Sequence, residues 1–195
     1  MLDFIKGEVV ELNPASVVVE AGGLGYIAQI SLYTYTALNG KPEAKVYVYE
    51  VIREDAHQLF GFIDKREREL FLLLISVSGV GANTARMILS SLSPGELEST
   101  ISSGNSNMLK AVKGIGAKTA ERIIIDLKDK VKLTGSVDAT VPQVSANDVV
   151  SGEAAAALVM LGFNQIASQK VISRIVKDNP GISVEQLIKS ALKML

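Results

Sequence analysis

The sequence contains no cysteine and a single histidine, His57, and these absences exclude several kinds of site. Without thiols the chain cannot form a disulfide, a thiolate zinc site, an iron–sulfur cluster or a cysteine nucleophile. A metal site at His57 would need further ligands to converge there, so a surface or half-buried hairpin position is the simpler expectation. We therefore expect no metal and no cofactor, and the lack of cysteine fits a reducing cytoplasm.

Long apolar runs are also missing. The longest, Leu70 to Ala82, is interrupted by serine and glycine and is too short to span a bilayer. The opening MLDFIKGEVVE carries an acidic residue early and no apolar run, so we expect no signal peptide. These features predict a cytoplasmic location and no membrane partner.

A large excess of positive charge is absent too, since the formal net charge is −1. The charge is nevertheless unevenly distributed. Residues 1–64 hold four Lys/Arg and nine Asp/Glu, whereas residues 65–132 hold eleven and seven. Residues 133–195 are balanced, with five of each. The chain is therefore polarised, with an acidic part followed by a basic part, and the basic part could meet an anionic partner.

The hydrophobic pattern of residues 1–64 predicts β-structure. Short runs rich in Val, Ile, Tyr and Phe are separated by turn-forming pairs such as Asn13-Pro14 and Asn39-Gly40. The expected strands are Val17–Glu20, Tyr26–Leu32, Val46–Ile52 and Gln58–Ile63. This spacing fits a five-stranded OB-like barrel, and a generic β-barrel fits nearly as well.

From Lys65 the apolar spacing becomes helical, which makes the whole chain an α+β protein of several domains. We expect a helical domain over residues 65–133 and, from small, polar, aperiodic residues, a flexible linker over 134–151. Residues 152–195 predict a bundle of three short helices, broken at Gly162 and at Pro180-Gly181.

A repeat lies within the helical domain. VSGVGANTARMIL, from Val77 to Leu89, recurs as VKGIGAKTAERII, from Val112 to Ile124, with seven of thirteen positions identical. In each copy a helix is expected to end, turn through Gly-x-Gly and restart. One such turn alone would be an ordinary helix cap. Two copies that share Gly-apolar-Gly and Thr-Ala favour a common function.

The repeated turns have the chemistry of a phosphate site. The first glycine can adopt the left-handed conformation that ends a helix, and the second lets another backbone approach closely. The next helix then offers unpaired N–H groups and a positive dipole end, to which Lys118 can add charge. Val80 and Ile115 are expected to plug the two helix pairs.

Other phosphate motifs do not fit. A P-loop needs glycine immediately before Lys-Thr, where this chain has Ala117, and a dinucleotide fingerprint needs a third glycine and a preceding strand. We therefore expect no nucleotide-hydrolysis site and no catalytic residue.

These residues carry a resemblance to a known family. The turns resemble helix-hairpin-helix motifs, which bind the DNA backbone without reading sequence. The chain is similar to the RuvA family of Holliday-junction-binding proteins through VIREDAHQLFGF, SGVG, KGIGAKTAERIIIDLKDK and AAALVMLGF, in that order. The resemblance implies DNA contacts by Gly79, Val80, Gly81, Asn83, Thr84, Arg86, Gly114, Ile115, Gly116, Lys118, Thr119 and Arg122.

The resemblance also gives Arg53-Glu54-Asp55 a role, although a solvated hairpin tip is the usual explanation of such a triplet. In RuvA-like proteins the matching carboxylates form an acidic pin at the centre of a tetramer. Glu54 and Asp55 would repel phosphates there and help keep the crossover strands of a four-way junction apart.

The remaining implications concern partners. The family implies a homotetramer, or an octamer on DNA, that works with the hexameric ATPase RuvB and the resolvase RuvC in recombination, DNA repair and the SOS response. The C-terminal domain would dock on RuvB, unless its apolar residues are simply core. The expected motor-binding residues are Leu161, Gly162, Phe163, Lys170 and Ile172.

The sequence departs from the family pattern at three positions. Asn83 and Ala117 stand where relatives often carry lysine, and Phe4 where a basic residue is common. Arg86 and Arg122, one turn further along their helices, are expected to compensate.

Two other functions remain open from the residues alone. DNA glycosylases use a similar hairpin, with a lysine at the place of Lys118 and an aspartate roughly where Asp138 stands. A single-strand binder could instead use barrel aromatics for stacking. The candidates for that role are Tyr33, Tyr35, Tyr47 and Tyr49.

Overall fold

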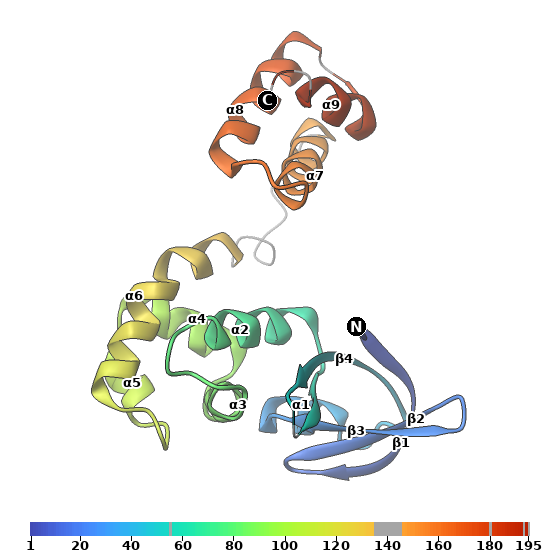
Figure 1. Cartoon of the computed structure of the whole chain (residues 1–195), viewed down its shortest axis with the longest axis vertical. Coiled ribbons are helices and arrows are strands. Elements are labelled where there is room, and N and C mark those ends of the chain that lie inside the picture. The colour runs from blue at the N-terminus through green and yellow to red at the C-terminus, as the bar shows by residue number, and fades with distance from the viewer. Residues whose placement is uncertain (55, 135–145, 180, 193, 195) are drawn as a thin grey trace. The chain divides into compact units, whose positions relative to one another are not determined.

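The N-terminal part of the chain forms a closed five-stranded barrel with the strand order β1-β2-β3-β5-β4, as the computed structural model shows in Figure 1. Its strands are β1 (Phe4–Asn13), β2 (Ser16–Ala21), β3 (Leu24–Ile30), β4 (Glu43–Ile52) and β5 (His57–Phe62). Among the strand pairs of the described residues, β3 with β5 is the one parallel pair. The predicted OB-like barrel is thus confirmed.

The structure describes residues 1–54, 56–134, 146–179, 181–192 and 194. The chain divides into two compact units, Met1–Asp138 and Ala139–Leu195.

Two elements of the barrel differ from the sequence-based expectation. Strand β1 was not predicted, because a register irregularity between Val9 and Glu11 interrupts its alternation of apolar and polar residues. The expected strand Tyr26–Leu32 stops at Ile30, because the Ser31 side chain accepts a hydrogen bond from Thr34 N–H and begins helix α1 (Leu32–Leu38). The barrel core consists of Ile5, Val17, Val19, Ala28, Ile30, Leu38, Val46 and Val48.

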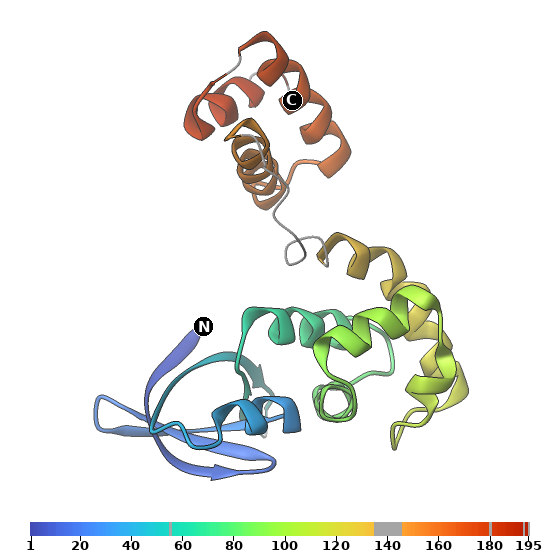
Figure 2. The ribbon, with the colours of Figure 1, turned by 180° about the vertical axis from the view of Figure 1, so that it is seen from behind.

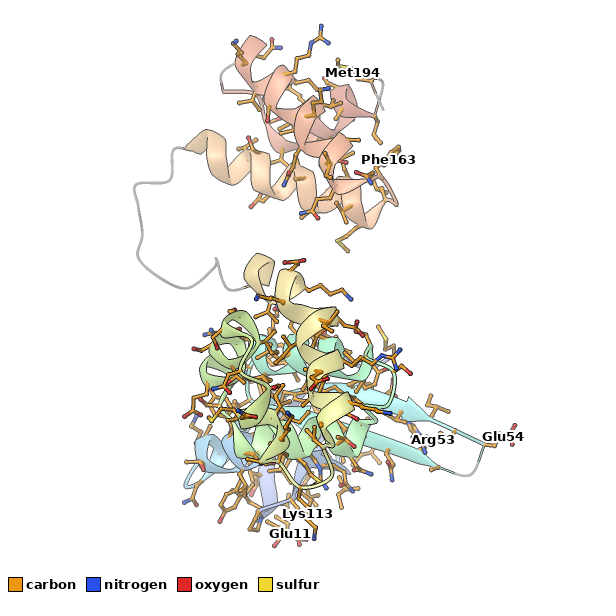
Figure 3. All side chains as sticks on the ribbon, turned by 90° about the vertical axis from the view of Figure 1, so that its left-hand side faces the viewer. Glu11, Arg53, Glu54, Lys113, Phe163 and Met194 are labelled. Carbon is orange, nitrogen blue, oxygen red and sulfur yellow. The ribbon has the colours of Figure 1, made fainter. Side chains whose placement is uncertain are left out.

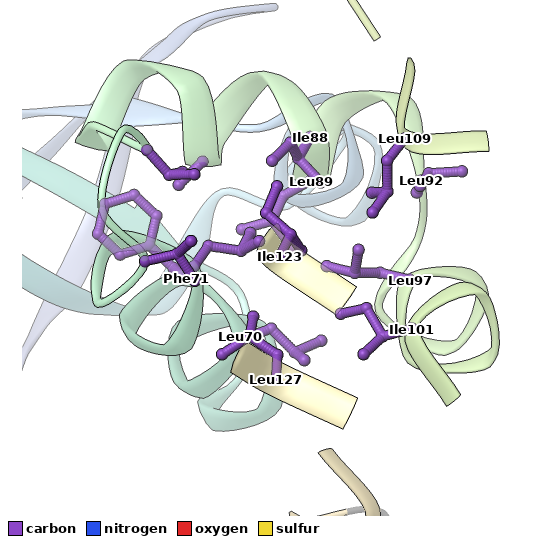
Figure 4. Packing of buried hydrophobic residues seen from close by; sticks show 14 of the residues in the cluster. Leu70, Phe71, Ile88, Leu89, Leu92, Leu97, Ile101, Leu109, Ile123 and Leu127 are labelled. Carbon is purple, nitrogen blue, oxygen red and sulfur yellow. The ribbon is translucent and has the colours of Figure 1, made fainter. Parts of the chain in front are cut away.

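The helices that follow the barrel in the first unit lie to one side of it (Figure 1). They are α2 (Lys65–Ile75), α3 (Ala82–Ser91), α4 (Pro94–Ser103), α5 (Ser106–Lys110) and α6 (Ala117–Thr134). Phe71 of α2 lies against Phe60 and Phe62 of β5, with ring centroids 5.2 and 4.9 Å apart. The Phe60 and Phe62 rings belong to a second apolar core, separate from the barrel core, which also contains Leu89, Ile123 and Leu127 of the helices (Figure 4).

Polar contacts also fix the helices to the barrel. Glu67 of α2 is fully buried and accepts hydrogen bonds from the hydroxyls of Ser31 and Thr34 and from Ile63 N–H. Burial raises the pKa of the Glu67 carboxyl. Leu32 N–H donates to Ser90 Oγ at 3.1 Å, which links α1 to α3. The orientation of α2 and α3 relative to the barrel is thus set by specific contacts.

The second unit is the predicted three-helix bundle, formed by α7 (Ala146–Met160), α8 (Gln165–Asp178) and α9 (Val184–Ala191) (Figure 2). Its core consists of Ala154, Leu158, Ile172, Ile175, Leu187 and Ala191. The predicted linker 134–151 needs a correction, because α7 already begins at Ala146. Packing of Val150 on the core outweighs the turn-forming character of the residues around it. The rest of that linker, residues 135–145, lies outside the described residues.

Candidate nucleic-acid interface

The first Gly-x-Gly turn has the conformation expected from the sequence. Gly79 lies in the left-handed region, with φ 92°, and the N–H of Val80 donates to the Val77 carbonyl at 3.0 Å. Gly81 is extended, with φ −89° and ψ 170°, and is the N-cap residue of α3. Its carbonyl accepts the first helical hydrogen bond, from Ala85 N–H at 2.9 Å.

The second turn repeats these features. Gly114 has φ 90°, and Ile115 N–H donates to the Val112 carbonyl at 3.1 Å. The Gly116 carbonyl accepts from Ala120 N–H at 3.0 Å, which places Gly116 at the N-cap of α6. The repeat in sequence is therefore a repeat in backbone conformation.

Both turns are locked from inside by the residue between the glycines. Val80 is 5% exposed and Ile115 is 6% exposed, and both belong to the core of the first unit. Ala85 and Ala120, on the helices that follow, are completely buried. The apolar plugs predicted from the sequence are thus confirmed, and the two buried alanines pack each following helix against the core.

The helices that follow the two turns begin without a side-chain cap. At five other helices, α1, α2, α4, α8 and α9, a side chain accepts a hydrogen bond from an N–H of the first turn. The capping residues are Ser31, Asp64, Ser93, Asn164 and Ser183. Gly81 makes no such bond, and glycine at Gly116 has no side chain to make one. The N-cap residues of α3 and α6 thus provide no side-chain acceptor for the first-turn N–H groups, which can bind an external one.

The space beside these glycines is open. A Cβ atom added at Gly79, Gly81, Gly114 or Gly116 would have no heavy atom within 4 Å. At Gly81 the backbone is also one that any residue can adopt. Neither packing nor backbone conformation within the chain explains glycine there, whereas the close approach of another molecule would.

Polar side chains surround the two turns. Lys118 and Asn83 are exposed, and Thr84 and Thr119 are half-buried. Arg122 is 57% exposed and lies 4.0 Å from Asp126, a weak contact that leaves the guanidinium available. These side chains can add charge and hydrogen bonds to an anion held by the backbone N–H groups.

The Arg86 side chain, which was predicted to contact DNA, instead makes a contact within the chain. Its Nη1 donates to the Ala15 carbonyl at 3.0 Å, which ties α3 to the barrel. Burial lowers the pKa of the half-buried Arg86 guanidinium. Because this side chain holds α3 against the barrel, Arg86 is not a phosphate ligand in this arrangement and does not compensate for Asn83.

The predicted acidic pin lies on the β4–β5 hairpin. Its last rung pairs Ile52 with His57, and Arg53 N–H donates to the Ala56 carbonyl at 2.8 Å. Figure 3 shows Arg53 and Glu54 at the end of this projecting arm, and Glu54 is exposed. Asp55, the second predicted pin residue, lies outside the described residues.

The four tyrosines predicted as candidates for base stacking are engaged within the protein. Tyr47 and Tyr49 are half-buried against the helical core, and Tyr35 packs on the barrel core. Tyr33 donates its hydroxyl to Asp64 at 3.3 Å, and burial raises its pKa. Base stacking would need free ring faces, so the single-strand alternative loses its support.

The alternatives based on Lys118 and His57 also gain no support. Asp138, the partner that a glycosylase mechanism would need, lies outside the described residues. His57 is 60% exposed, and its Nε2 lies 3.4 Å from Glu50 Oε1. Within the described ranges, no group of three His, Cys, Asp or Glu side chains could hold a metal ion.

In the second unit, the predicted motor-binding residues separate into two groups. Ile172 is 2% exposed and belongs to the core, so the expectation that it is a surface contact is wrong. Phe163 is half-buried against the same core. Leu161 is 60% exposed, Gly162 turns the chain with φ 95°, and Lys170 is exposed.

Two exposed apolar residues beside Leu161 were not predicted from the sequence. Met160 is 89% and Ile166 is 78% exposed. With Leu161, they form an apolar surface at the turn from α7 to α8, here called the α7–α8 surface. For Met160 this exposure could have been predicted from its position in the helix. Leu158, two residues earlier, faces the core, and residues two apart lie on different sides of a helix. None of the helices described is both long and apolar enough to cross a bilayer.

The geometry agrees with three family descriptions. "RuvA N terminal domain" matches residues 1–61, "SAM-like Helix-hairpin-helix tandem" residues 71–129, and "RuvA, C-terminal domain" residues 149–195. These matches cover the barrel, the two glycine turns and the three-helix bundle.

Full-length relatives show the same similarity. The chain is 60% identical over 196 residues to a protein of Parabacteroides distasonis and 57% identical over 202 residues to one of Bacteroides fragilis. It is 44% identical over 195 residues to one of Flavobacterium psychrophilum. In each case the alignment covers 100% of both chains, and each relative is named "Holliday junction branch migration complex subunit RuvA". The chain belongs to the RuvA family.

Proposed function

We propose that this protein is the non-catalytic subunit of a branch-migration complex that binds a four-way DNA junction and holds it open. The observation that carries the proposal is the pair of uncapped helix N-termini at Gly81 and Gly116, each beside open space. Each can bind a phosphate oxygen with backbone N–H groups, which act on any sequence alike.

DNA binding by this protein would combine many weak contacts. Each chain offers two hairpins, and assembly into a homotetramer, or into an octamer on DNA, multiplies them. Linked weak sites gain through effective concentration, so a protein with a net charge of −1 can still bind DNA tightly. Lys118 and Arg122 add local positive charge, and binding should weaken steeply as salt is raised.

The pin gives the preference for a junction. Glu54 at the tip of the β4–β5 arm places negative charge where a continuous duplex would bring phosphates, and Asp55 would add to it. Four such tips around a tetramer axis would disfavour an unbroken duplex at the centre and separate the strands of an open crossover.

The second unit links the junction to a motor. The α7–α8 surface, Met160, Leu161 and Ile166, exposes apolar side chains that a partner would cover. We assign it to the ATPase RuvB, with Lys170 at its edge. RuvC would resolve the same junction, in recombination, repair and the SOS response in the cytoplasm.

Amide hydrogen exchange with a four-way junction of synthetic oligonucleotides tests the grip. We expect the junction to protect the amides of residues 81–84 and 116–119, together with those near Glu54. Protection confined to the barrel aromatics, or absence of protection at both turns under saturating junction, would contradict the proposal.

A further inference from the structure

The arm that carries Glu54 has little support from the barrel. Among the described residues, β1 pairs with β4 only as far as the rung Phe4–Tyr47. Strand β3 pairs with β5 only from the rung Ala28–Leu59 onward. The outer rungs of the arm, such as Ile52–His57, therefore join only two strands. A two-stranded ribbon is at best marginally stable alone, so other contacts must hold the arm.

On one face of the arm, polar groups converge on Glu50. The Leu2 N–H donates to Glu50 Oε2 at 2.9 Å, and His57 Nε2 lies 3.4 Å from Oε1. The amino group of Met1 lies 3.9 Å from Oε2. The Glu50 side chain is only 14% exposed, and the Leu2 N–H is the main cause that lowers its pKa.

The segment that approaches Glu50 is itself anchored to α2. The Asp3 carbonyl accepts from Val48 N–H at 3.0 Å and from Arg68 Nη1 at 2.8 Å, and Asp3 Oδ1 lies 2.6 Å from the same Nη1. Arg68 belongs to α2, the helix that leads into the first glycine turn. Its side chain is 18% exposed and also lies 5.2 Å from the Tyr47 ring.

We propose that Arg68, Asp3, Leu2 and Glu50 form a brace that sets the angle of the pin arm relative to α2, with Glu50 as its positioning residue. The brace holds one face of the arm, while Val51 on the other face packs on the helical core. The brace thereby links Glu54, which would repel phosphates, to α2 and the glycine turn after it, which would bind them. This inference rests on the proposed function, since the arm matters only if it meets DNA.

The distance from Glu50 to the tip of the arm is long enough that a small change of angle at Glu50 would displace Glu54 appreciably. Glu54 lies four residues beyond Glu50, about 13 Å at the rise of an extended strand. A tilt of about 15° at Glu50 would move the tip by about 3 Å, comparable to a hydrogen-bond length. Loss of the brace should therefore disturb the shape of the bound junction more than the affinity for it, because the glycine turns still bind phosphates.

The experiment compares Glu50→Ala, Glu50→Gln and Asp3→Ala with Glu43→Ala, an exposed position on the same strand. Without DNA, we expect Glu50→Ala to speed amide exchange over residues 51–57 about tenfold. Asp3→Ala should have a smaller effect in the same direction, because the Asp3 carbonyl keeps its bonds to Val48 N–H and Arg68. Glu50→Gln should lose less protection, because its amide oxygen can still accept from Leu2 N–H. Unchanged exchange in Glu50→Ala, or an equal loss in Glu43→Ala, would overturn the brace.

With DNA, fluorescence energy transfer between labelled junction arms is measured at saturating protein. We expect Glu50→Ala to broaden the distribution of arm distances while its affinity for the junction changes less than about threefold. A loosened arm with an unchanged distribution would refute the positioning role. If the wild-type protein failed to bind the junction at all, the proposed function would fall, and the exchange data would still decide on the brace.

Discussion

Replacement of Gly81 by serine should stabilise the protein and weaken its binding to DNA. The backbone of Gly81, with φ −89° and ψ 170°, is close to that of the capping residue Ser31, with φ −81° and ψ 165°. No heavy atom lies within 4 Å of the added Cβ, so Gly81→Ser can be accommodated without strain. The new hydroxyl would accept a first-turn N–H of α3, as Ser31 and Ser93 do at their helices.

The two effects have opposite signs and can be estimated separately. A serine cap is worth a few tenths of a kcal/mol over glycine and should raise the midpoint of thermal unfolding by about 1 °C. Loss of one hydrogen bond to a charged phosphate costs about 1.5–3 kcal/mol, or roughly tenfold to a hundredfold in the affinity of that hairpin.

The assay pairs thermal unfolding with titration of a labelled four-way junction. Ser93→Ala is the matched control, because it removes a cap from α4 and should lower stability by about 1 kcal/mol without changing junction affinity. A Gly81→Ser protein that is more stable and binds as tightly as the wild type would refute phosphate binding at this helix N-terminus.

Three further predictions follow from the same structure. Gly114→Asp should weaken junction binding sharply, measured by the same titration, because φ is 90° there and the carboxylate would face phosphate. Removal of residues 146–195 should leave junction affinity intact and abolish stimulation of RuvB ATP hydrolysis; lost DNA binding would contradict this division. Since burial raises the folded-state pKa of Glu67, its stabilising contribution is full below about pH 4.3 and is lost as pH rises through that raised value. The unfolding free energy of the wild type should therefore fall relative to that of Glu67→Gln as pH rises, in denaturant titrations; parallel curves would refute this.

The parts of the site that the sequence predicted are those decided by local chemistry. Left-handed Gly79 and Gly114, and the plugs Val80 and Ile115, follow from residues within one turn of each other. The local sequence does not predict helix α1, because LYTYTAL is rich in β-forming residues. The segment is nevertheless helical, and its Leu38 is buried in the barrel. Tertiary packing outweighed propensity there.

The parts that the sequence did not predict depend on partners far along the chain. Arg86 stands one turn beyond the first hairpin and could have served DNA, but it binds the carbonyl of Ala15, 71 residues away. Ile172 lies in a segment with several apolar residues, and only the packing of α8 decides which of them faces the core. Both distinctions require the folded arrangement of the helices.

The most direct test of the account is the affinity of the wild-type protein for a four-way junction and for a linear duplex of the same sequences, measured at one fixed salt concentration. The glycine turns alone would bind both, whereas Glu54 on its projecting arm penalises a continuous duplex at the centre of the assembly. We predict a strong preference for the junction. Equal affinity for the two DNAs would contradict the account and leave the turns as a general grip on DNA.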